Sequence, residues 1–498
     1  MLFNSVNFLI FFPVVVLAYF IIPKKFRYVW LLVASYYFYM SWFPKWAVLL
    51  LFSTAVTYMS GLLLEWIKHR PWEERRRVRW KKLCVLGSFG ANLAVLALFK
   101  YSNFLIDNVN SLLELLHMEA LDISFGLALP VGISFYTFQA LSYTMDVYRD
   151  EIYAEKNFLK YALFVSFFPQ LVAGPIERSK NLLKQINTEH SFCEESVKEG
   201  LLLMLWGYFL KMVVADRISV FVDCVYGDYQ KFGGWFLILA SVLFAFQIYC
   251  DFAGDSVIAM GAARVMGFRL MDNFDCPYFS RSVSEFWRRW HISLSSWFKD
   301  YLYIPLGGNR KGKLRQYVNI MIVFAVSGLW HGADWTYIIW GTLNGAFQVL
   351  GALTGKLRSA AKVKLGLNTS SFGHKAAQTL ITFCLVDFAW IFFRAQTFAD
   401  AAGVIKSMVT VRNPWIFLDG TLYEAGLDCR NFWLMVICIG ILLAADWFKY
   451  RGIQLRKVLM RQELWFRWCV YIGGILFVLM FGIWGSAYSA GSFIYFQF

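Results

Sequence analysis

Residues 327–340 read SGLWHGADWTYIIW and place one histidine, His331, between two long apolar runs. An ionisable side chain at membrane depth costs roughly 2.5–3.5 kcal/mol even on permissive insertion scales, so such a residue is a functional candidate. Beside it, Trp330 can wall a pocket, and Gly332 leaves room for a backbone or ligand to approach closely. The alternative is a histidine at a helix end that only bonds a carbonyl. The spacing alone does not separate the two.

Apolar runs like these recur along most of the chain. Of its 498 residues, 59% are hydrophobic, 19% are aromatic and only 16% are charged. Soluble domains average about 25% charged residues, and apolar runs of 17–25 residues match a bilayer core about 30 Å thick. The runs are continuous and lack the alternation of barrel strands, so they predict helices. We therefore expect an all-α polytopic membrane protein with a single integral-membrane domain over residues 1–498.

The distribution of charge orients these spans. The formal net charge is +15, but the basic residues gather in short loops, which is the positive-inside pattern and argues against nucleic-acid binding. Residues 68–82 carry eight Lys or Arg against two Glu, whereas 105–126 carry four acids and no Lys or Arg, as an outside loop may. Placing 68–82 inside also puts the basic loops 309–316, 355–375 and 449–461 inside, and both termini outside. The predicted spans are 3–22, 27–43, 46–66, 83–104, 127–147, 199–215, 235–252, 317–330, 335–354, 376–394, 431–447 and 465–485.

One apolar segment breaks this count of crossings. Residues 158–173, FLKYALFVSFFPQLVA, would invert every later loop if they crossed the membrane. Pro169, Gly174 and Pro175 interrupt the segment, and helices usually end before such residues. We predict a re-entrant or broken helix. Because irregular backbone at membrane depth must be buried in protein or line a cavity, we expect FFPQLVAGPIER (167–178) to line one.

A second informative stretch, FWRRWHISLSSWFKDYLYIPLGGNR, covers residues 286–310. If it is one helix, it is basic, aromatic and amphipathic, and suits the cytoplasmic boundary of a membrane. His291 falls on the aromatic face, where the alternative is a core histidine satisfied by a neighbour. The residues that would share that face are Trp287, Trp290, His291, Leu294, Trp297 and Tyr301.

Histidine is the side chain that best fits a catalytic role here. Only two of the six histidines, His291 and His331, fall in apolar surroundings. The chain has no HExxH or CxxC spacing and no GxSxG elbow, so we expect no metal site and no nucleophilic serine of that type. A histidine general base acting on a hydroxyl group is the simplest chemistry, and such a base contributes about 10²–10⁴-fold in rate.

Four stretches together resemble the membrane-bound O-acyltransferase (MBOAT) family, in its bacterial branch for O-acetylation of alginate and cell-wall polysaccharide. They are WHGADWTYIIWG, FWRRWHISLSSWFKDYLYIPLGGNR, FPQLVAGPIER and DFAG, and the resemblance covers nearly the whole chain with a signature core at about 127–354. It implies a ring of about 11–12 transmembrane helices, with re-entrant and interfacial helices, around a central tunnel. It also implies that His331 is catalytic and that His291 is the second site histidine. The chain departs from the family pattern at Val257 and Asn344.

The last six residues, FIYFQF (493–498), fit an FxYxxF motif that ends related acetylation proteins. The resemblance implies that Tyr495, in an extracytoplasmic tail at 486–498, accepts the acyl group and passes it on. A phenol with a pKa of about 10 is a poor nucleophile unless an adjacent base activates it. The alternative is an aromatic tail that anchors the chain at the interface.

These observations predict a membrane O-acyltransferase of the bacterial cytoplasmic (inner) membrane. It would move an acetyl group from a cytoplasmic acyl thioester, acetyl-CoA as co-substrate, to an extracytoplasmic polysaccharide such as alginate. We expect no tightly bound cofactor, and as partners membrane lipid and an exported SGNH-type acetyltransferase. One alternative is D-alanyl transfer to teichoic acid, where a separate protein supplies the tyrosine motif. Another is a transporter of lipid-linked glycan, against which the absence of an inverted repeat argues.

Overall fold

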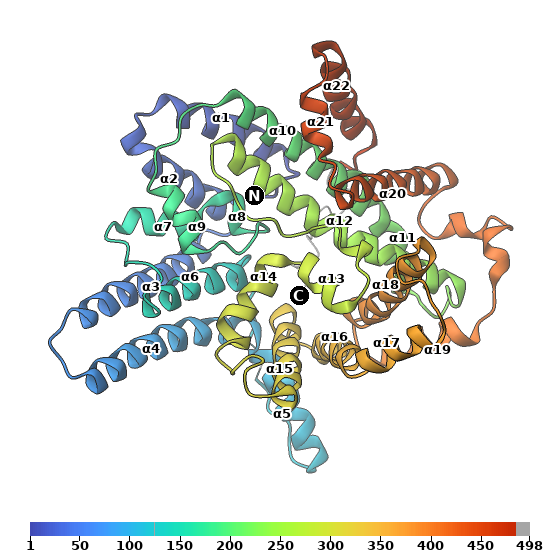
Figure 1. Cartoon of the computed structure of the whole chain (residues 1–498), viewed down its shortest axis with the longest axis horizontal. Helices are drawn as coiled ribbons and strands as arrows, with labels where there is room; N and C mark the ends of the chain where they lie inside the picture. The colour runs from blue at the N-terminus through green and yellow to red at the C-terminus, as the bar shows by residue number, and fades with distance from the viewer. Residues whose placement is uncertain (124, 485–498) are drawn as a thin grey trace. The chain divides into compact units, whose positions relative to one another are not determined.

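Helices provide all the regular structure in the part of the chain that the structure describes, residues 1–123 and 125–484 (Figure 1). This computed structural model confirms the predicted all-α class. The chain divides into a first unit, Met1–Met204 with Ser256–Met271, and a second unit, Leu205–Asp255 with Asp272–Phe498. Each unit is described by itself below. The single domain over the whole chain stays a prediction.

The first unit holds the N-terminal helices and the end of one long helix. Its helices are α1 (Val6–Ile21), α2 (Arg27–Met40), α3 (Trp46–Lys68), α4 (Glu74–Lys100), α5 (Ser102–Leu115), α6 (Ile133–Tyr148), α7 (Phe158–Ser166), α8 (Phe168–Leu171), α9 (Ser179–Ile186), most of α10 (Glu194–Tyr208) and the last turns of α12 (Trp235–Val265).

Small and hydroxylated residues on α3 allow three neighbouring helices to pack closely against it. A Cβ atom on Gly61 would lie 2.6 Å from the ring of Tyr143 on α6, so this position has room only for glycine. The Ser53 hydroxyl bonds Asn92 of α4 at 2.6 Å, and the Tyr161 hydroxyl of α7 donates to Thr57 at 2.7 Å. Helices in membranes commonly associate through such small residues and interhelical hydrogen bonds. Figure 1 shows α3, α4 and α6 side by side.

The apolar segment at 158–173 is broken, as predicted. The first helix, α7, ends at Ser166, α8 runs over Phe168–Leu171 with Pro169 in its first turn, and α9 begins only at Ser179. Every residue from 161 to 179 is buried. The backbone N–H of Phe168 donates to the Ser35 hydroxyl at 3.0 Å. A side chain of the first unit therefore satisfies one N–H group of this irregular backbone, and the lining of a cavity by 167–178 stays a prediction.

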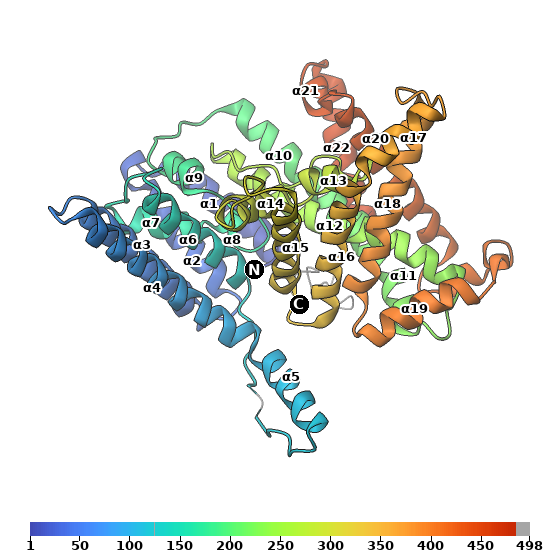
Figure 2. The same ribbon diagram turned by 60° about the horizontal axis from the view of Figure 1, so that its bottom comes forward.

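The prediction of a loop over residues 105–126 is wrong in its first half, because α5 occupies it. Two asparagines of this helix tie the returning segment to it. Asn103 exchanges hydrogen bonds with the backbone of Phe125 (3.1 and 3.2 Å), and Asn110 does so with Leu121 (2.7 and 3.1 Å). The two asparagines thus bond backbone groups of the non-helical residues Leu121 and Phe125. Figure 2 shows α5 projecting away from the other helices of the first unit.

The second unit begins within α10 and holds the remaining helices. They are the first part of α12, α11 (Asp216–Gly227), α13 (Val283–Arg289), α14 (Ile292–Phe298), α15 (Lys313–His331), α16 (Trp335–Leu353), α17 (Gly355–Lys364), α18 (Phe372–Arg394), α19 (Phe398–Thr410), α20 (Cys429–Tyr450), α21 (Leu455–Met460) and α22 (Leu464–Phe481).

Six helices within the described ranges are long and apolar enough to cross a membrane. They are α3, α4, α12, α18, α20 and α22, and the shorter α1 is also apolar. Multiple crossings are therefore confirmed, and the other predicted spans lie in helices that are shorter or less apolar. The number of about 11–12 spans and the central tunnel stay predictions.

A buried ion cluster joins α12 to the π-helical segment Phe209–Ala215 inside the second unit. The Lys211 ammonium lies 2.9 Å from an Asp216 oxygen and also bonds Asp251. Asp255, one turn beyond Asp251 on α12, is buried as well, and all four residues are at most 7% exposed. Gly254 lets α12 approach, since a Cβ atom there would lie 2.9 Å from the Lys211 backbone nitrogen. The DFAG motif thus supplies a carboxylate and a close helix contact.

Candidate functional site

The last residue of α15 is His331, and its side chain is 3% exposed. Its Nδ1 lies 2.6 Å from the backbone carbonyl oxygen of Ser327, one turn earlier in the same helix. A carbonyl oxygen can only accept a hydrogen bond, so Nδ1 carries the proton. In the neutral imidazole the other nitrogen, Nε2, then keeps its lone pair. This tautomer is the one that a general base needs.

The chain turns sharply after His331 because two glycines remove bulk between α15 and α16. A Cβ atom on Gly332 would lie 2.1 Å from the Tyr337 ring, and one on Gly328 would lie 2.2 Å from the Tyr337 carbonyl oxygen. Asp334 caps α16 by accepting from the backbone N–H of Thr336 at 2.8 Å. Figure 2 shows the two helices side by side. The hairpin therefore fixes the end of α15, and with it the position of His331.

Replacing Gly341 with alanine is expected to disrupt this hairpin. The new Cβ atom would lie 2.2 Å from the Phe324 carbonyl oxygen and 3.0 Å from Gly328, which are backbone atoms that cannot rotate away. Overpacking of this kind costs about 1–3 kcal/mol. Thermal unfolding of the purified protein in detergent measures the loss. Gly351→Ala in the same helix is the matched control, because its nearest atom is 3.9 Å away. Equal melting temperatures for the two variants would contradict the prediction.

The predicted continuous helix from residue 286 onward is wrong, because the backbone breaks at His291. There φ is 44° and ψ is 54°, between the end of α13 at Arg289 and the start of α14 at Ile292. Asn273 holds the break: its carbonyl accepts from the Ile292 N–H at 2.9 Å, and its side chain accepts from the Ser293 hydroxyl at 2.6 Å. The left-handed conformation costs a non-glycine residue roughly 1–3 kcal/mol, and such residues cluster at functional sites.

The structure brings the two predicted histidines together. The ring centroids of His291 and His331 are 6.3 Å apart, and His291 is fully buried. Trp330 contacts both rings, at 6.0 Å from His291 and 4.9 Å from His331. The rings of Trp340 and Phe393 pack on His331 at 4.8 and 5.8 Å, and Phe252 packs on His291 at 4.6 Å. Two imidazoles thus share an aromatic environment inside the second unit.

The sequence predicts no site role for two buried asparagines that support this histidine pair, although Asn344 is a departure from the family pattern. Asn273, described above, fixes the turn at His291. Asn344 of α16 is 1% exposed, accepts from the Trp287 indole N–H at 3.1 Å and donates to the Trp340 carbonyl at 2.9 Å. It thereby ties α13 to the helix that packs on His331. Asn344 could have been recognised from the sequence, because it is a lone amide in an apolar run and a buried amide needs hydrogen-bond partners. Asn273 lies in a polar stretch, so the sequence does not mark it as buried.

The third predicted site residue, Tyr495, lies outside the described residues. Its place relative to the histidines therefore stays a prediction, as does its role as an acyl relay.

Comparison with known proteins bears on this site. A family model described as the membrane-bound O-acyltransferase family matches residues 91–369, which include both histidines. A probable alginate O-acetylase of Pseudomonas putida is 38% identical over 414 residues, covering 82% of this chain and 80% of that protein. A peptidoglycan O-acetyltransferase of Helicobacter pylori is 34% identical over 441 residues, covering 82% and 80%. A teichoic acid D-alanyltransferase of Streptococcus thermophilus is 28% identical over 237 residues, covering 44% and 56%.

The helical fold with several membrane crossings and the buried pair of histidines define a multi-pass membrane protein with an interior site. The family match covers more than half of the chain, and each of the first two relatives aligns with 82% of it. The chain belongs to the membrane-bound O-acyltransferase family. It is therefore a membrane acyltransferase, as its sequence motifs predict.

Proposed function

We propose that this protein transfers an acetyl group from a cytoplasmic acyl thioester, acetyl-CoA, for O-acetylation of an extracytoplasmic polysaccharide. The observation that carries the proposal is the 2.6 Å distance between His331 Nδ1 and the Ser327 carbonyl oxygen, which assigns the proton to Nδ1, next to a second buried histidine. The names of two relatives, an alginate O-acetylase and a peptidoglycan O-acetyltransferase, support acetyl as the group and polysaccharide as the acceptor.

In the proposed reaction, His331 acts as a general base on the accepting hydroxyl. Its Nε2 takes the hydroxyl proton while the oxygen attacks the thioester carbonyl carbon and forms a tetrahedral intermediate. When the C–S bond breaks, the same nitrogen returns the proton to the thiolate. The products are an ester and a free thiol, and no net proton is gained or lost. A base of this kind contributes about 10²–10⁴-fold in rate.

We assign His291 to the carbonyl side of the reaction. A ring N–H of a neutral imidazole can donate to the oxygen that becomes negative in the tetrahedral intermediate. Such preorganised donors contribute most where water is excluded, and burial of both rings in an aromatic environment supports that condition. Asn273 helps to orient the His291 ring, because its hydrogen bond with Ser293 holds the backbone turn at His291.

We further propose that Tyr495 is the first acceptor. Its phenol would form an acetyl ester, from which an exported SGNH-type transferase takes the acetyl group to the sugar. The cytoplasmic membrane as location, with both termini outside, follows from the charge pattern of the loops.

Replacing Tyr495 with phenylalanine is expected to remove a base-labile acetyl group from the C-terminal peptide. The substitution deletes only the hydroxyl that would carry the ester. Mass spectrometry of the protein isolated from acetylating cells measures the change in mass. Tyr471→Phe is a matched control on α22. An acetylated C-terminal peptide in the Tyr495→Phe variant would overturn the relay. So would the absence of an acetyl group on the unchanged protein isolated from cells that lack the SGNH-type transferase.

The match to a teichoic acid D-alanyltransferase supports a second candidate function, D-alanyl transfer from a carrier protein. Supplying membranes with radiolabelled acetyl-CoA or with a radiolabelled D-alanyl carrier separates the two candidates, because only the true donor loses its label. Family membership supports acyl transfer over transport of a lipid-linked glycan.

A further inference from the structure

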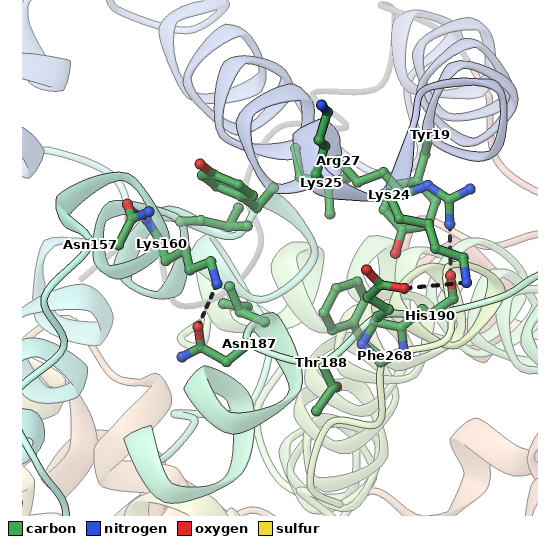
Figure 3. Close-up of a pocket in the computed structure, with 15 residues that line it drawn as sticks. Tyr19, Lys24, Lys25, Arg27, Asn157, Lys160, Asn187, Thr188, His190 and Phe268 are labelled. Atoms are coloured by element: carbon green, nitrogen blue, oxygen red, sulfur yellow. Dashed lines mark hydrogen bonds and ion pairs between the residues drawn. The ribbon is translucent and has the colours of Figure 1, made fainter.

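A cavity of about 360 Å³ lies within the first unit, where α2 begins and α9 ends (Figure 3). Four cations line it, Lys24, Lys25, Arg27 and Lys160, against a single carboxylate. Burial, together with the nearby Arg27 charge, lowers the pKa of His190, so this imidazole stays neutral at pH 7. The lining therefore has a formal charge of +3. A concave surface with such a surplus of one sign concentrates anions.

The Arg27 guanidinium is held firmly, but by neutral groups. It donates to the carbonyl oxygens of Phe20 (3.0 Å), Ile22 (3.0 Å) and His190 (2.7 Å). It also lies over the Tyr19 ring at 5.0 Å. Since none of these partners is a carboxylate, the positive charge is fixed in place without being neutralised. Arginine held in this way is a common element of phosphate recognition.

Two lysines reach the cavity from different segments, as Figure 3 shows. The Lys160 ammonium bonds the neutral Asn187 amide oxygen at 2.8 Å. The Lys24 ammonium lies 3.4 Å from a Glu189 oxygen, and the two side chains are 46% and 68% exposed. An exposed pair of this kind is worth about 0–1 kcal/mol, so an incoming anion can displace Glu189. In the same view Lys25 points away from the other cations.

The inner wall of the cavity is apolar. Leu31, Leu163 and Phe268 line it and are 1%, 0% and 3% exposed. A lining with charged groups at the rim and apolar groups behind them is better suited to bind an amphiphile than a fully hydrated anion. The turn between α1 and α2 also joins two predicted spans, 3–22 and 27–43, and we therefore expect it to lie near phospholipid headgroups.

We propose that this cavity binds the phosphate of an anionic phospholipid headgroup, such as that of phosphatidylglycerol. Lys24, Arg27 and Lys160 contact the phosphate oxygens, and the apolar wall takes the glycerol backbone and the start of an acyl chain. Basic residues near a membrane surface favour anionic lipid in this way. The charge pattern of the loops places the site in the cytoplasmic leaflet.

Binding of defined lipids to the purified full-length protein tests the proposal, with native mass spectrometry and thermal unfolding as readouts. Phosphatidylglycerol is expected to bind and to raise the melting temperature, whereas phosphatidylcholine with the same chains is not. The double variant Lys24→Gln/Lys160→Gln should weaken binding about fivefold per lysine, or about 25-fold in all. Lys356→Gln/Lys364→Gln, on exposed positions of α17, is the matched control and should bind like the unchanged protein.

A change of the opposite sign sharpens the test. Glu189→Gln removes the only carboxylate of the lining and releases Lys24, so phosphatidylglycerol should bind about fivefold more tightly. Weaker or equal binding by this variant would contradict the proposal. So would equal binding of phosphatidylcholine, or an unchanged affinity of the double lysine variant. Inorganic phosphate and coenzyme A should displace bound phosphatidylglycerol less well than unlabelled phosphatidylglycerol does. Equal displacement would show that the cavity binds soluble anions and would overturn the lipid assignment.

Discussion

Replacing His331 with alanine is expected to lower acetyl transfer to polysaccharide by a factor on the order of 10²–10⁴. The substitution removes the imidazole whose Nε2 accepts the hydroxyl proton in the proposed reaction. His331→Gln is expected to lose as much activity, although its amide can still donate to the Ser327 carbonyl, because an amide is not a base. Base-labile acetate in extracellular polysaccharide, measured at equal amounts of protein in the membrane, reports the loss.

The matched control for His331 is His69→Ala. The side chain of His69 is 70% exposed and pairs with Glu65 on α3, so its removal should leave activity unchanged. Melting temperatures of all three variants show whether the fold persists. Acetylation by a well-folded His331→Ala variant at the unchanged level would exclude the histidine mechanism. A parallel loss in the His69 variant would point to a general defect of the membrane preparation.

Replacing Lys211 with methionine is expected to destabilise the protein by about 3–5 kcal/mol, because breaking a buried ion pair leaves charge without compensation. The cation lies 2.9 Å from an Asp216 oxygen and also bonds Asp251, so both carboxylates lose this ammonium group at once. Thermal unfolding in detergent, followed by tryptophan fluorescence, measures the change. A drop in melting temperature of several degrees is the expected result.

A second substitution shows whether charge causes that loss. Lys211→Met combined with Asp251→Asn removes one of the uncompensated charges and should recover part of the melting temperature. Lys356→Met, at an exposed position of α17, is the control for changing lysine to methionine and should have little effect. If the double variant were as unstable as the two single changes added together, the loss would come from packing and not from charge.

Much of the fold could be predicted because long apolar runs and their interruptions are local signals. The break near Pro169 and the multiple crossings are of this kind. The helix α5 was missed because the four acids of 105–126 and its lack of Lys or Arg indicate only an outside loop, whereas Asn103 and Asn110 bond backbone some 11 to 22 residues away. Only the folded chain shows such a pairing.

The candidate site was partly predictable for the same reason. His331 stands out in an apolar run, and the family resemblance of residues 286–310 pointed to His291. The closeness of the two rings, 6.3 Å, depends on tertiary packing that no local pattern encodes. Lys211, a single cation in an apolar run, carries a similar signal in the sequence, although it was not among the predicted site residues. Its partner Asp251 is 40 residues further along the chain, so only the structure pairs them.

The turn at His291 leaves little freedom for evolutionary change at this residue. A positive φ favours glycine, and after it asparagine or aspartate, because their side chains tolerate the left-handed conformation best. The proposed chemistry demands an imidazole. The backbone conformation and the proposed chemistry therefore favour different residues at position 291. Glycine would relieve the backbone strain but has no ring, and a bulkier aromatic residue would fill the space but strain the backbone. The hydrogen bonds to Asn273 stabilise the left-handed turn. The residues that position 291 can accept therefore depend on a partner 18 positions earlier.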